Sequence, residues 1–541
     1  MCRRSILWII ETLLFLGLLF WNTASIGQAA APQDGVRWHW RTANDGYWYS
    51  SEIVSIADQN GDGIRDVLIS CPHKMVFWED PRLIFVSGSD GELIRIDEHH
   101  EPLERYGLGL GNAGDADGDG VDDYAIGNPD FRGGYGKVEV KSGVDGSLIY
   151  EWAGIEPSQG LGYRVGGVGD VDGDGRDDLA FSGGRLFITS GRTKEILRRF
   201  PSGNFCRAND LNSDGFNDVV VAYPLATPNG NPVGEVVAYS GHDGQELWRT
   251  EGPWHNSNFG MSIASIGDLD GDGAGELLIG APHYDNRRGG ICMLEGATGQ
   301  IIQQYFGYRE KDRFGTSVCG PGDMNGDGIP DYAMGAMQRG VRYPTQGRGY
   351  VVAFSGADHH QFFLATGALK SRFGFNMSAI GDINQDGQAD LAISSSGWSN
   401  PWIDAWGFNT YLTASASNIK ASATEPVEFH VTFPATEALR PYRILLSHSG
   451  VGPTSINGFE IPLSWDNLLN SSLSGQIPPL SNGFAGQLDG FGRAYAQLTG
   501  GPHLARWPGA RLYFAAVSFE IIGSSRIGKL TSVPLTLEID P

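Results

Sequence analysis

The sequence predicts an all-β protein built from a repeated four-stranded unit, and three observations support this. A nine-residue acidic motif recurs seven times along the chain. Short apolar runs of strand length flank each copy. Glycine-containing turns such as SGVDG, which have hairpin chemistry, separate many of these runs. The copies start 57, 55, 40, 58, 55 and 59 residues apart. A period of this size indicates a solenoid or a propeller, and four short strands per unit favour a propeller.

The acidic motif is first met with carboxylates at all of its key positions at 115–123, where it reads DADGDGVDD. Positions 1, 3, 5 and 9 carry a side-chain oxygen in every copy, and position 6 is always glycine. Position 7 varies freely, as expected of a residue that offers only its backbone carbonyl. Glycine permits the sharp turn that wraps such a loop around a hard cation. The motif therefore predicts up to seven structural Ca²⁺ sites.

The predicted ligands are the residues at positions 1, 3, 5, 7 and 9 of each copy. In chain order these are Asp58, Asn60, Asp62, Ile64, Asp66, Asp115, Asp117, Asp119, Val121, Asp123, Asp170, Asp172, Asp174, Arg176, Asp178, Asp210, Asn212, Asp214, Phe216, Asp218, Asp268, Asp270, Asp272, Ala274, Glu276, Asp323, Asn325, Asp327, Ile329, Asp331, Asp382, Asn384, Asp386, Gln388 and Asp390. Position 12, which is glutamate in an EF-hand, is apolar in every copy, so the ninth acid must close the shell. Ligands limited to oxygen argue against zinc and copper.

The net charge of −24 is explained by these loops alone. Positions 1, 3, 5 and 9 hold 24 carboxylates, and the remaining 39 acidic residues balance the 39 Lys and Arg. Carboxylates crowded this closely repel one another unless a cation neutralises them. The alternative is a set of hydrated acidic turns without an ion, which seven copies in register disfavour. Nothing in this balance suggests a nucleic-acid partner.

The units also predict how the ring closes. The fifth unit illustrates the four strands, in FGMSIASIGD, ELLIGAP, GGICMLEG and QIIQQYF. After the seventh motif the third strand is expected within 405–414, and no fourth strand is evident. The N-terminal segment VRWHWRT resembles the fourth strand of another unit, ELWRTE. We therefore expect the N-terminal strand to complete the last blade of a seven-bladed β-propeller with calcium loops, spanning 36–415.

Two further short motifs accompany the acidic one. An aromatic or large apolar residue stands nine positions before six of the motifs, mostly followed by glycine, at Tyr49, Tyr106, Leu161, Phe259, Phe314 and Phe373. A second motif follows the loops, as in Gly280-Ala281-Pro282. Together these features resemble the FG-GAP repeat family, the calcium-bearing propeller of integrin α subunits and of many secreted bacterial proteins. The resemblance implies seven blades and calcium in the blade loops, and it leaves the ligand open. The fourth copy departs from the pattern, with Pro201 at the aromatic position, which puts its Asp210 loop in doubt.

The two ends of the chain differ from the repeats. Residues 1–31 combine Arg3 and Arg4 with an apolar run and small residues, which is typical of a secretory signal peptide. Residues 416–541 contain no acidic motif and alternate strand-like runs with turns, so we expect a small β-sandwich. Part of this tail, 484–517, resembles a C-terminal module of secreted bacterial proteins. The cysteines after the signal are expected to be buried free thiols, because equivalent points two repeats apart are too distant to bridge.

We expect the functional surface on the side of the ring opposite the acidic loops. Alternation of the strands places the loops between second and third strands, and between units, on that side. In the fifth and sixth units these loops carry aromatic residues and the cations Arg287, Arg288, Arg309, Lys311, Arg313, Arg339, Arg342 and Arg348. Such a surface suits an anionic glycan or an acidic protein surface, although an ordinary solvated set of loops is the alternative.

The sequence therefore predicts a secreted or cell-surface calcium-binding propeller, periplasmic if the source is Gram-negative, that acts in recognition or adhesion. Its partner would be an extracellular protein or an anionic glycan, and the mature chain would have no membrane span. The motifs of zinc proteases, serine hydrolases and P-loop enzymes are not found, so we predict that it is not an enzyme. A calcium-dependent polysaccharide lyase, or another carbohydrate-active enzyme on a propeller scaffold, is the alternative.

Overall fold

The structure is a computed structural model, and it describes most of the repeat region and much of the C-terminal part. The described residues are 36–41, 52–72, 80–101, 104–338, 347–359, 361–396, 402–408, 412–415, 418–420, 426–433, 437–449, 454–456, 459–461, 463–474, 481–490, 492–499, 504, 510–522, 525–531 and 535–540. The signal peptide predicted over 1–31 lies outside them, as does Tyr49. In the described part of the chain, no helix is long and apolar enough to span a membrane.

The repeat region is all-β and consists of four-stranded antiparallel sheets, which we number in chain order. Sheet one contains β2 (Ile53–Ile56), β3 (Asp66–Cys71), β4 (Arg82–Val86) and β5 (Leu93–Glu98). Sheet two contains β6 (Gly109–Gly114), β7 (Asp123–Asn128), β8 (Lys137–Lys141) and β9 (Leu148–Ala153). Sheet three contains β10 (Arg164–Gly169), β11 (Asp178–Ser182), β12 (Arg185–Thr189) and β13 (Ile196–Pro201). Sheet four contains β14 (Asn204–Ala208), β15 (Asp218–Tyr223), β16 (Glu235–Tyr239) and β17 (Glu246–Glu251).

The later sheets follow the same order, and the last one uses the N-terminal strand. Sheet five contains β18 (Ser262–Gly267), β19 (Glu276–Ala281), β20 (Gly290–Leu294) and β21 (Ile301–Phe306). Sheet six contains β22 (Phe314–Gly322), β23 (Asp331–Ala336), β24 (Tyr350–Phe354) and β25 (Gln361–Thr366). Sheet seven contains β26 (Phe373–Gly381), β27 (Asp390–Ser395), β28 (Trp402–Trp406) and β1 (Val36–Arg41). Short helical turns occur at α2 (Phe131–Gly134), η1 (Pro228–Gly230) and α3 (Tyr284–Arg287).

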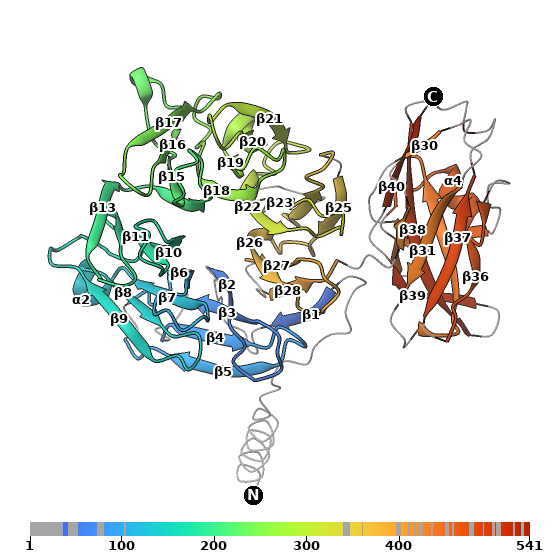
Figure 1. Ribbon diagram of the computed structural model, residues 1–541, viewed down its shortest axis with the longest axis horizontal. Coiled ribbons are helices and arrows are strands. Elements are labelled where there is room, and N and C mark those ends of the chain that lie inside the picture. The colour runs from blue at the N-terminus through green and yellow to red at the C-terminus, as the bar shows by residue number, and fades with distance from the viewer. Residues whose placement is uncertain are drawn as a thin grey trace, which may run out of the picture.

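The sheets are arranged around a common centre, with the first strand of each innermost (Figure 1). Each pair of successive sheets shares a hydrophobic cluster, and the cluster around Ile53, Ile380 and Ile403 joins sheet seven to sheet one. In that same junction the indole of Trp38 donates a hydrogen bond of 2.7 Å to the carbonyl of Gly88. The apolar faces of the sheets are therefore buried against their neighbours all round the repeat region. This arrangement is that expected of a β-propeller.

The aromatic-glycine motif marks a contact between neighbouring sheets. Phe314 is buried, and Gly315 beside it has a φ of +83°. A Cβ on Gly315 would lie 2.7 Å from the carbonyl oxygen of Gly290 and 3.1 Å from the Cα of Gly280, both in sheet five. Glycine is needed here both for the left-handed backbone and for the close approach. The second motif, Gly280-Ala281-Pro282, supplies part of the surface against which Gly315 packs.

The C-terminal part forms a four-stranded sheet, a six-stranded sheet, a small hairpin and a helix (Figure 1). One sheet has the order β29 (Leu412–Ala414), β31 (Val427–Thr432), β37 (Arg493–Leu498) and β35 (Ser481–Asn482). The other has the order β30 (Asn418–Lys420), β40 (Leu535–Asp540), β38 (Arg511–Ile522), β32 (Pro441–Ser447) and β36 (Ala485–Gln487), with β39 (Ser525–Thr531) paired to β38. A small hairpin joins β33 (Thr454–Ile456) to β34 (Phe459–Ile461), and the helix is α4 (Asn467–Ser474). Phe429 and Phe514, one from each sheet, lie in the same hydrophobic cluster.

The expectation for the third strand of sheet seven is wrong in position. It was placed within 405–414, whereas β28 is Trp402–Trp406 and Leu412–Ala414 belongs to the C-terminal sheets. The turn chemistry that marks the end of this strand elsewhere is missing, because Gly407-Phe408 follows β28. The expectation of free thiols agrees with the structure. Cys71, Cys292 and Cys319 are buried free cysteines, and Cys206 is a half-buried one.

Candidate metal-binding loops

Each acidic motif forms the loop between the first and second strand of a sheet, and the loop folds around its first residue. In sheet two, Asp115 Oδ1 accepts the amide of Gly118 at 2.7 Å and its Oδ2 accepts the amide of Gly120 at 3.0 Å. The first aspartate accepts the amide of the sixth residue in all seven loops, at distances from 2.7 to 3.0 Å. The carboxylate at position 1 therefore organises the loop backbone.

The glycine at position 6 is required by backbone conformation rather than by space. Its φ lies between +82° and +96° in the seven loops, and an added Cβ would meet nothing within 4 Å. This is the left-handed region, which glycine adopts without steric cost. The amide of position 7 then donates to the carboxylate at position 5, as Val121 does to Asp119 at 2.9 Å. The predicted turn is therefore present.

The ninth acid is buried and connects two segments of its sheet. In sheet three, Asp178 Oδ2 accepts the amide of Val171, at the start of the loop, at 2.9 Å. Its Oδ1 accepts the amide of Gly191, in the turn between β12 and β13, also at 2.9 Å. The ninth residue accepts the amide of position 2 in all seven loops. This acid is thus a structural acceptor as well as a candidate ligand, a role that the sequence did not reveal.

Burial and crowding raise the pKa of these ninth acids. Removal from water, opposed by the backbone hydrogen bonds and reinforced by neighbouring loop carboxylates, raises the pKa of Asp178 to about 7. The same causes raise the pKa of Asp123 to about 6 and that of Asp331 to about 8. A bound cation would remove this penalty by neutralising the charge.

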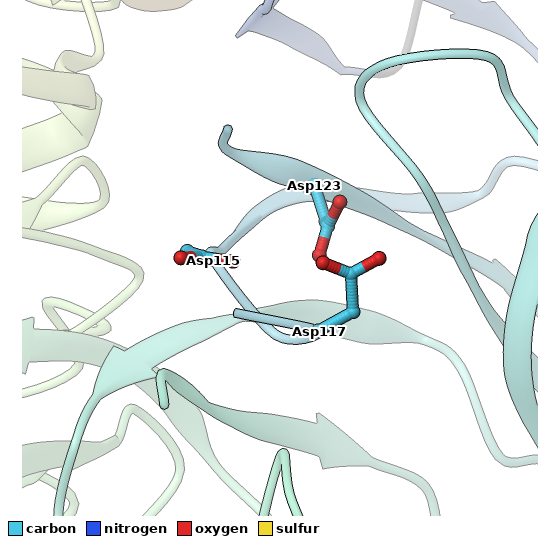
Figure 2. A group of neighbouring side chains, drawn as sticks. All are labelled: Asp115, Asp117 and Asp123. Atoms are coloured by element: carbon cyan, nitrogen blue, oxygen red, sulfur yellow. The ribbon is translucent and has the colours of Figure 1, made fainter. Parts of the chain in front are cut away.

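Three loops bring carboxylate oxygens together as a cation site requires. In sheets two, three and five, one oxygen from each of positions 1, 3 and 9 lies within 4.8 Å of the other two. Figure 2 shows this for Asp115, Asp117 and Asp123, with the last two carboxylates facing each other. The donor set is oxygen only, which suits a hard divalent cation such as Ca²⁺. These acidic clusters therefore have the ligand types needed by the Ca²⁺ ion that the repeat implies.

The remaining four loops have asparagine at position 3, and its amide donates to a neighbouring carboxylate. The donors are the Nδ2 atoms of Asn60, Asn212, Asn325 and Asn384, with acceptors 3.1, 2.9, 3.1 and 3.4 Å away. An asparagine oxygen is still a hard ligand, but these loops carry one charge fewer. The structure therefore divides the loops into an aspartate class and an asparagine class.

A serine in the turn between the third and fourth strands also contacts the loop. The hydroxyls of Ser190, Ser240 and Ser355 donate to the position-5 carboxylate of their own sheets at 3.1, 3.3 and 3.0 Å. The signal for this partner was present in the turn motifs, which begin with serine, but their spacing indicated only a hairpin. In sheet five the same place is taken by Glu295. The turns and the acidic loops lie on the same side of the sheets, as strand alternation predicts.

The opposite side, which we call the variable-loop side, is formed by the loops between second and third strands and between sheets. In sheet two, Arg105 forms an ion pair with Asp130 at 2.5 Å. In sheet five, Trp254 and Tyr284 are in ring contact, with centroids 4.5 Å apart. Arg339 and Arg342, which the sequence also placed on this side, lie outside the described residues.

The second-to-third-strand loop of sheet five adopts an unusual backbone. Asp285, Asn286 and Arg287 are three consecutive exposed residues with φ of +45°, +53° and +64°. The corresponding loop of sheet two makes a similar turn with Arg132, Gly133 and Gly134. A non-glycine residue in this conformation costs about 1 kcal/mol, so the sheet-five loop is strained.

Positive charge gathers around the strained loop. Arg287, Arg309 and Lys311 are exposed, and within the described residues none of them forms an ion pair. Burial, followed by the charges of Arg313 and Arg287, lowers the pKa of His283. The nearby cations therefore disfavour the protonated imidazole.

Comparison with known proteins agrees with the repeat and its geometry. Residues 259–300, which contain β18, β19 and β20 of sheet five, match the FG-GAP repeat model. The chain is similar to integrin α chains: 28% identical over 40% of this chain to integrin alpha-5 of Xenopus laevis, and 32% identical over 34% of this chain to integrin alpha-PS2 of Drosophila melanogaster. It is 28% identical over 33% of this chain to integrin alpha pat-2 of Caenorhabditis briggsae. The FG-GAP, integrin α-like character expected from the sequence is thus confirmed.

These matches have limited extent. The matched region is only 14–18% of the length of those integrin chains. A solved structure of BBS1N in complex with ARL6DN, soaked with lead, has a TM-score of 0.44 and 8% identity, covering 71% of this chain and 97% of that chain. At this level of similarity, that likeness says nothing about function.

Proposed function

We propose that this protein is a secreted or cell-surface, calcium-stabilised β-propeller that serves recognition or adhesion without catalysing a reaction. The similarity to integrin α chains supports an adhesive role. The strained loop of sheet five and the exposed cations on it and on the connection to sheet six are the observation that carries the proposal. Strain of this kind persists where the surrounding structure holds it, and it is concentrated at functional sites.

In this proposal, residues 36–415 form seven blades and 416–541 form a β-sandwich. The pairing of β1 with β28 supports a ring closed by the N-terminal strand, since the two ends of the repeat region then share one sheet. The shared cluster of Phe429 and Phe514 supports two C-terminal sheets packed face to face. The signal sequence predicted over 1–31 supports export.

Calcium is proposed to be structural, with the ligands named from the sequence. Residues at positions 1, 3, 5 and 9 would supply side-chain oxygens, and position 7 a backbone carbonyl. A bound ion would neutralise the facing carboxylates of the loop. In sheets one, two, three, four and six the ninth acid also accepts an amide of the turn between the third and fourth strands, so the ion would fix the loop to that turn. The side of the ring that carries the acidic loops would then be a rigid base for the variable-loop side.

The ligand is proposed to be anionic, either an acidic glycan or an acidic protein surface. Arg287, Arg309 and Lys311 would attract it, and the nearby rings of Trp254 and Tyr284 offer apolar contact. Guanidinium groups bind carboxylate and sulfate oxygens in a bidentate manner, which favours Arg-rich loops for such ligands.

The test is a charge reversal of Arg287, Arg309 and Lys311 to glutamate, measured on an array of anionic polysaccharides. We expect binding to weaken by about tenfold or more, because three attractive charges become repulsive. A control variant reverses Arg199, Lys420 and Arg493, which are exposed residues outside this cluster, and so matches the change in net charge. Equal binding by both variants would refute the proposed surface. Unsaturated products in the same samples would instead favour the lyase alternative.

A further inference from the structure

The acidic loop of sheet five has a carboxylate that no other described turn supplies. The first residue of the turn between the third and fourth strands is Ser87, Ser142, Ser190, Ser240 and Ser355 in sheets one, two, three, four and six. In sheet five it is Glu295, half-buried, which follows Leu294 at the end of β20. A serine hydroxyl can donate to the position-5 carboxylate, whereas an ionised glutamate only accepts.

Glu295 faces the loop directly. One of its carboxylate oxygens lies within 4.8 Å of oxygens from both Asp270 and Asp272. Asp270 belongs as well to the group formed with Asp268 and Glu276. Because Asp270 belongs to both groups, five carboxylates from three chain segments lie close together. Without a cation this arrangement is repulsive, and Glu295 contributes to the repulsion where serine would relieve it.

A second observation at the same loop points to a missing positive partner. Glu276, the ninth acid, is 1% exposed, and its Oε2 accepts the amide of Leu269 at 2.7 Å. Its Oε1 is buried and has no hydrogen-bond donor. The amide of Gly296 also favours the ionised carboxylate, but it leaves Oε1 without a hydrogen bond. The ninth aspartate of sheet three, by contrast, has both oxygens satisfied by amides.

A buried carboxylate oxygen without a donor is costly, and a cation is the partner that would satisfy it. The cation would lie among Asp268, Asp270 and Glu276, whose oxygens already converge. Glu295 and Asp272 would complete its surroundings from the side of the turn. The number of charged ligands is one of the properties that set the affinity of a calcium loop.

We propose that Glu295 is an additional cation ligand that makes the sheet-five loop the tightest divalent-cation site of the chain. The ion then bridges three segments, namely the acidic loop, the start of β19 and the turn between β20 and β21. This inference rests on the proposed binding of calcium by the acidic loops, and it assigns to one loop a ligand that lies outside the nine-residue motif.

The experiment compares the intact chain with Glu295→Ser, which restores the residue of the other turns, and with Glu295→Gln, which keeps the size. Calcium binding is followed by calorimetry, and occupancy of sheet five by terbium luminescence. Trp248 is suited to sensitise terbium there, since its indole donates to the carbonyl of Gly296 at 2.8 Å, next to Glu295. We expect the tightest site to weaken by about tenfold, or one ion to be lost, in both variants.

A reciprocal variant, Ser355→Glu, places the same carboxylate in the turn of sheet six, where Ser355 contacts Asp327 at 3.0 Å. We expect a second tight site to appear. A matched control, Ser355→Ala, removes the hydroxyl without adding charge and leaves the tight-site affinity unchanged. Unaltered calcium and terbium titrations in Glu295→Ser would overturn this inference alone, with calcium binding by the other loops intact. A chain that binds no calcium at all would overturn the proposed calcium sites together with it.

Discussion

The aspartate loops and the asparagine loops share one backbone and differ in how they balance charge. In sheet four, Asn212 donates its amide to Asp214 at 2.9 Å, so the loop supplies its own partner. In sheet three, Asp172 faces Asp170 and Asp178 within 4.8 Å and has no proton to donate when ionised. The group at position 3 thus changes the charge balance of a loop without metal. We infer that the aspartate loops depend on a cation more strongly than the asparagine loops.

The largest expected effect is that of removing calcium from the whole chain. An ion that binds only the folded state at 100 times its dissociation constant stabilises that state by about 2.7 kcal/mol per site. Loss from several sites should therefore lower the midpoint of thermal unfolding by well over ten degrees, at roughly 2–4 °C for each 1 kcal/mol. Differential scanning calorimetry with excess chelator, and again after excess calcium is restored, measures this shift of the unfolding midpoint. A thermal transition that does not move would contradict the calcium assignment for both classes.

The pH dependence of the chelated chain provides a check on this result. Burial and neighbouring carboxylates raise the pKa of Asp218 to about 6 and that of Asp331 to about 8, from an ordinary value of 3.8. Between about pH 4 and pH 8 the folded chain then holds protons that the unfolded chain has released, so its stability falls as pH rises. With calcium bound the acids stay ionised and this decline should largely disappear. Equal pH profiles with and without calcium would contradict the role of these acids.

The second effect, smaller than full chelation, is that of removing one ninth acid. Asp178→Ala should cost about 3 kcal/mol even in chelator, because the amides of Val171 and Gly191 lose a shared buried acceptor. Asp218→Ala in the asparagine loop of sheet four should cost a similar amount in chelator, since it also accepts two amides. Urea unfolding with and without calcium separates the classes. When calcium is present, we expect the further loss of unfolding free energy to be greater for Asp178→Ala than for Asp218→Ala. An equal loss would contradict the distinction between the aspartate and asparagine loops.

Much of the fold could be predicted because the repeat carries redundant signals. The first and ninth residues of the motif, its glycine and the strand-length runs all agree, and the run ELLIGAP, expected as the second strand of the fifth unit, contains β19 (Glu276–Ala281). The third strand of sheet seven was misplaced because Gly407 stands where serine or glutamate begins the turn in the six earlier sheets. A single departure from the repeated turn was enough to shift that assignment.

The side-chain partners around the loops could not be predicted. Ser190 and Asp174 are 16 residues apart, and their contact depends on the register between β11 and β12. From the sequence alone, Asp and Asn at position 3 are equivalent, because each offers a side-chain oxygen as a ligand. Their difference lies in the amide protons, which become important only when the neighbouring carboxylates are placed in space. The unpaired oxygen of Glu276 is likewise a property of geometry, because glutamate and aspartate are equally acceptable at the ninth position by type.

The smallest expected effect exchanges the two classes at position 3. Asp172→Asn should stabilise the chelated chain by about 1 kcal/mol, because an amide donor replaces a repelling carboxylate. Asn212→Asp should destabilise it by about the same amount, since it removes the hydrogen bond to Asp214. In excess calcium both signs should reverse, because the aspartate then contributes a charged ligand. Chemical unfolding of the two variants and the parent chain is measured with chelator and with calcium. It gives the change in the free energy of unfolding for each substitution in each condition. Shifts of the same sign in both conditions would mean that position 3 acts on loop geometry rather than on the balance between carboxylates and cation.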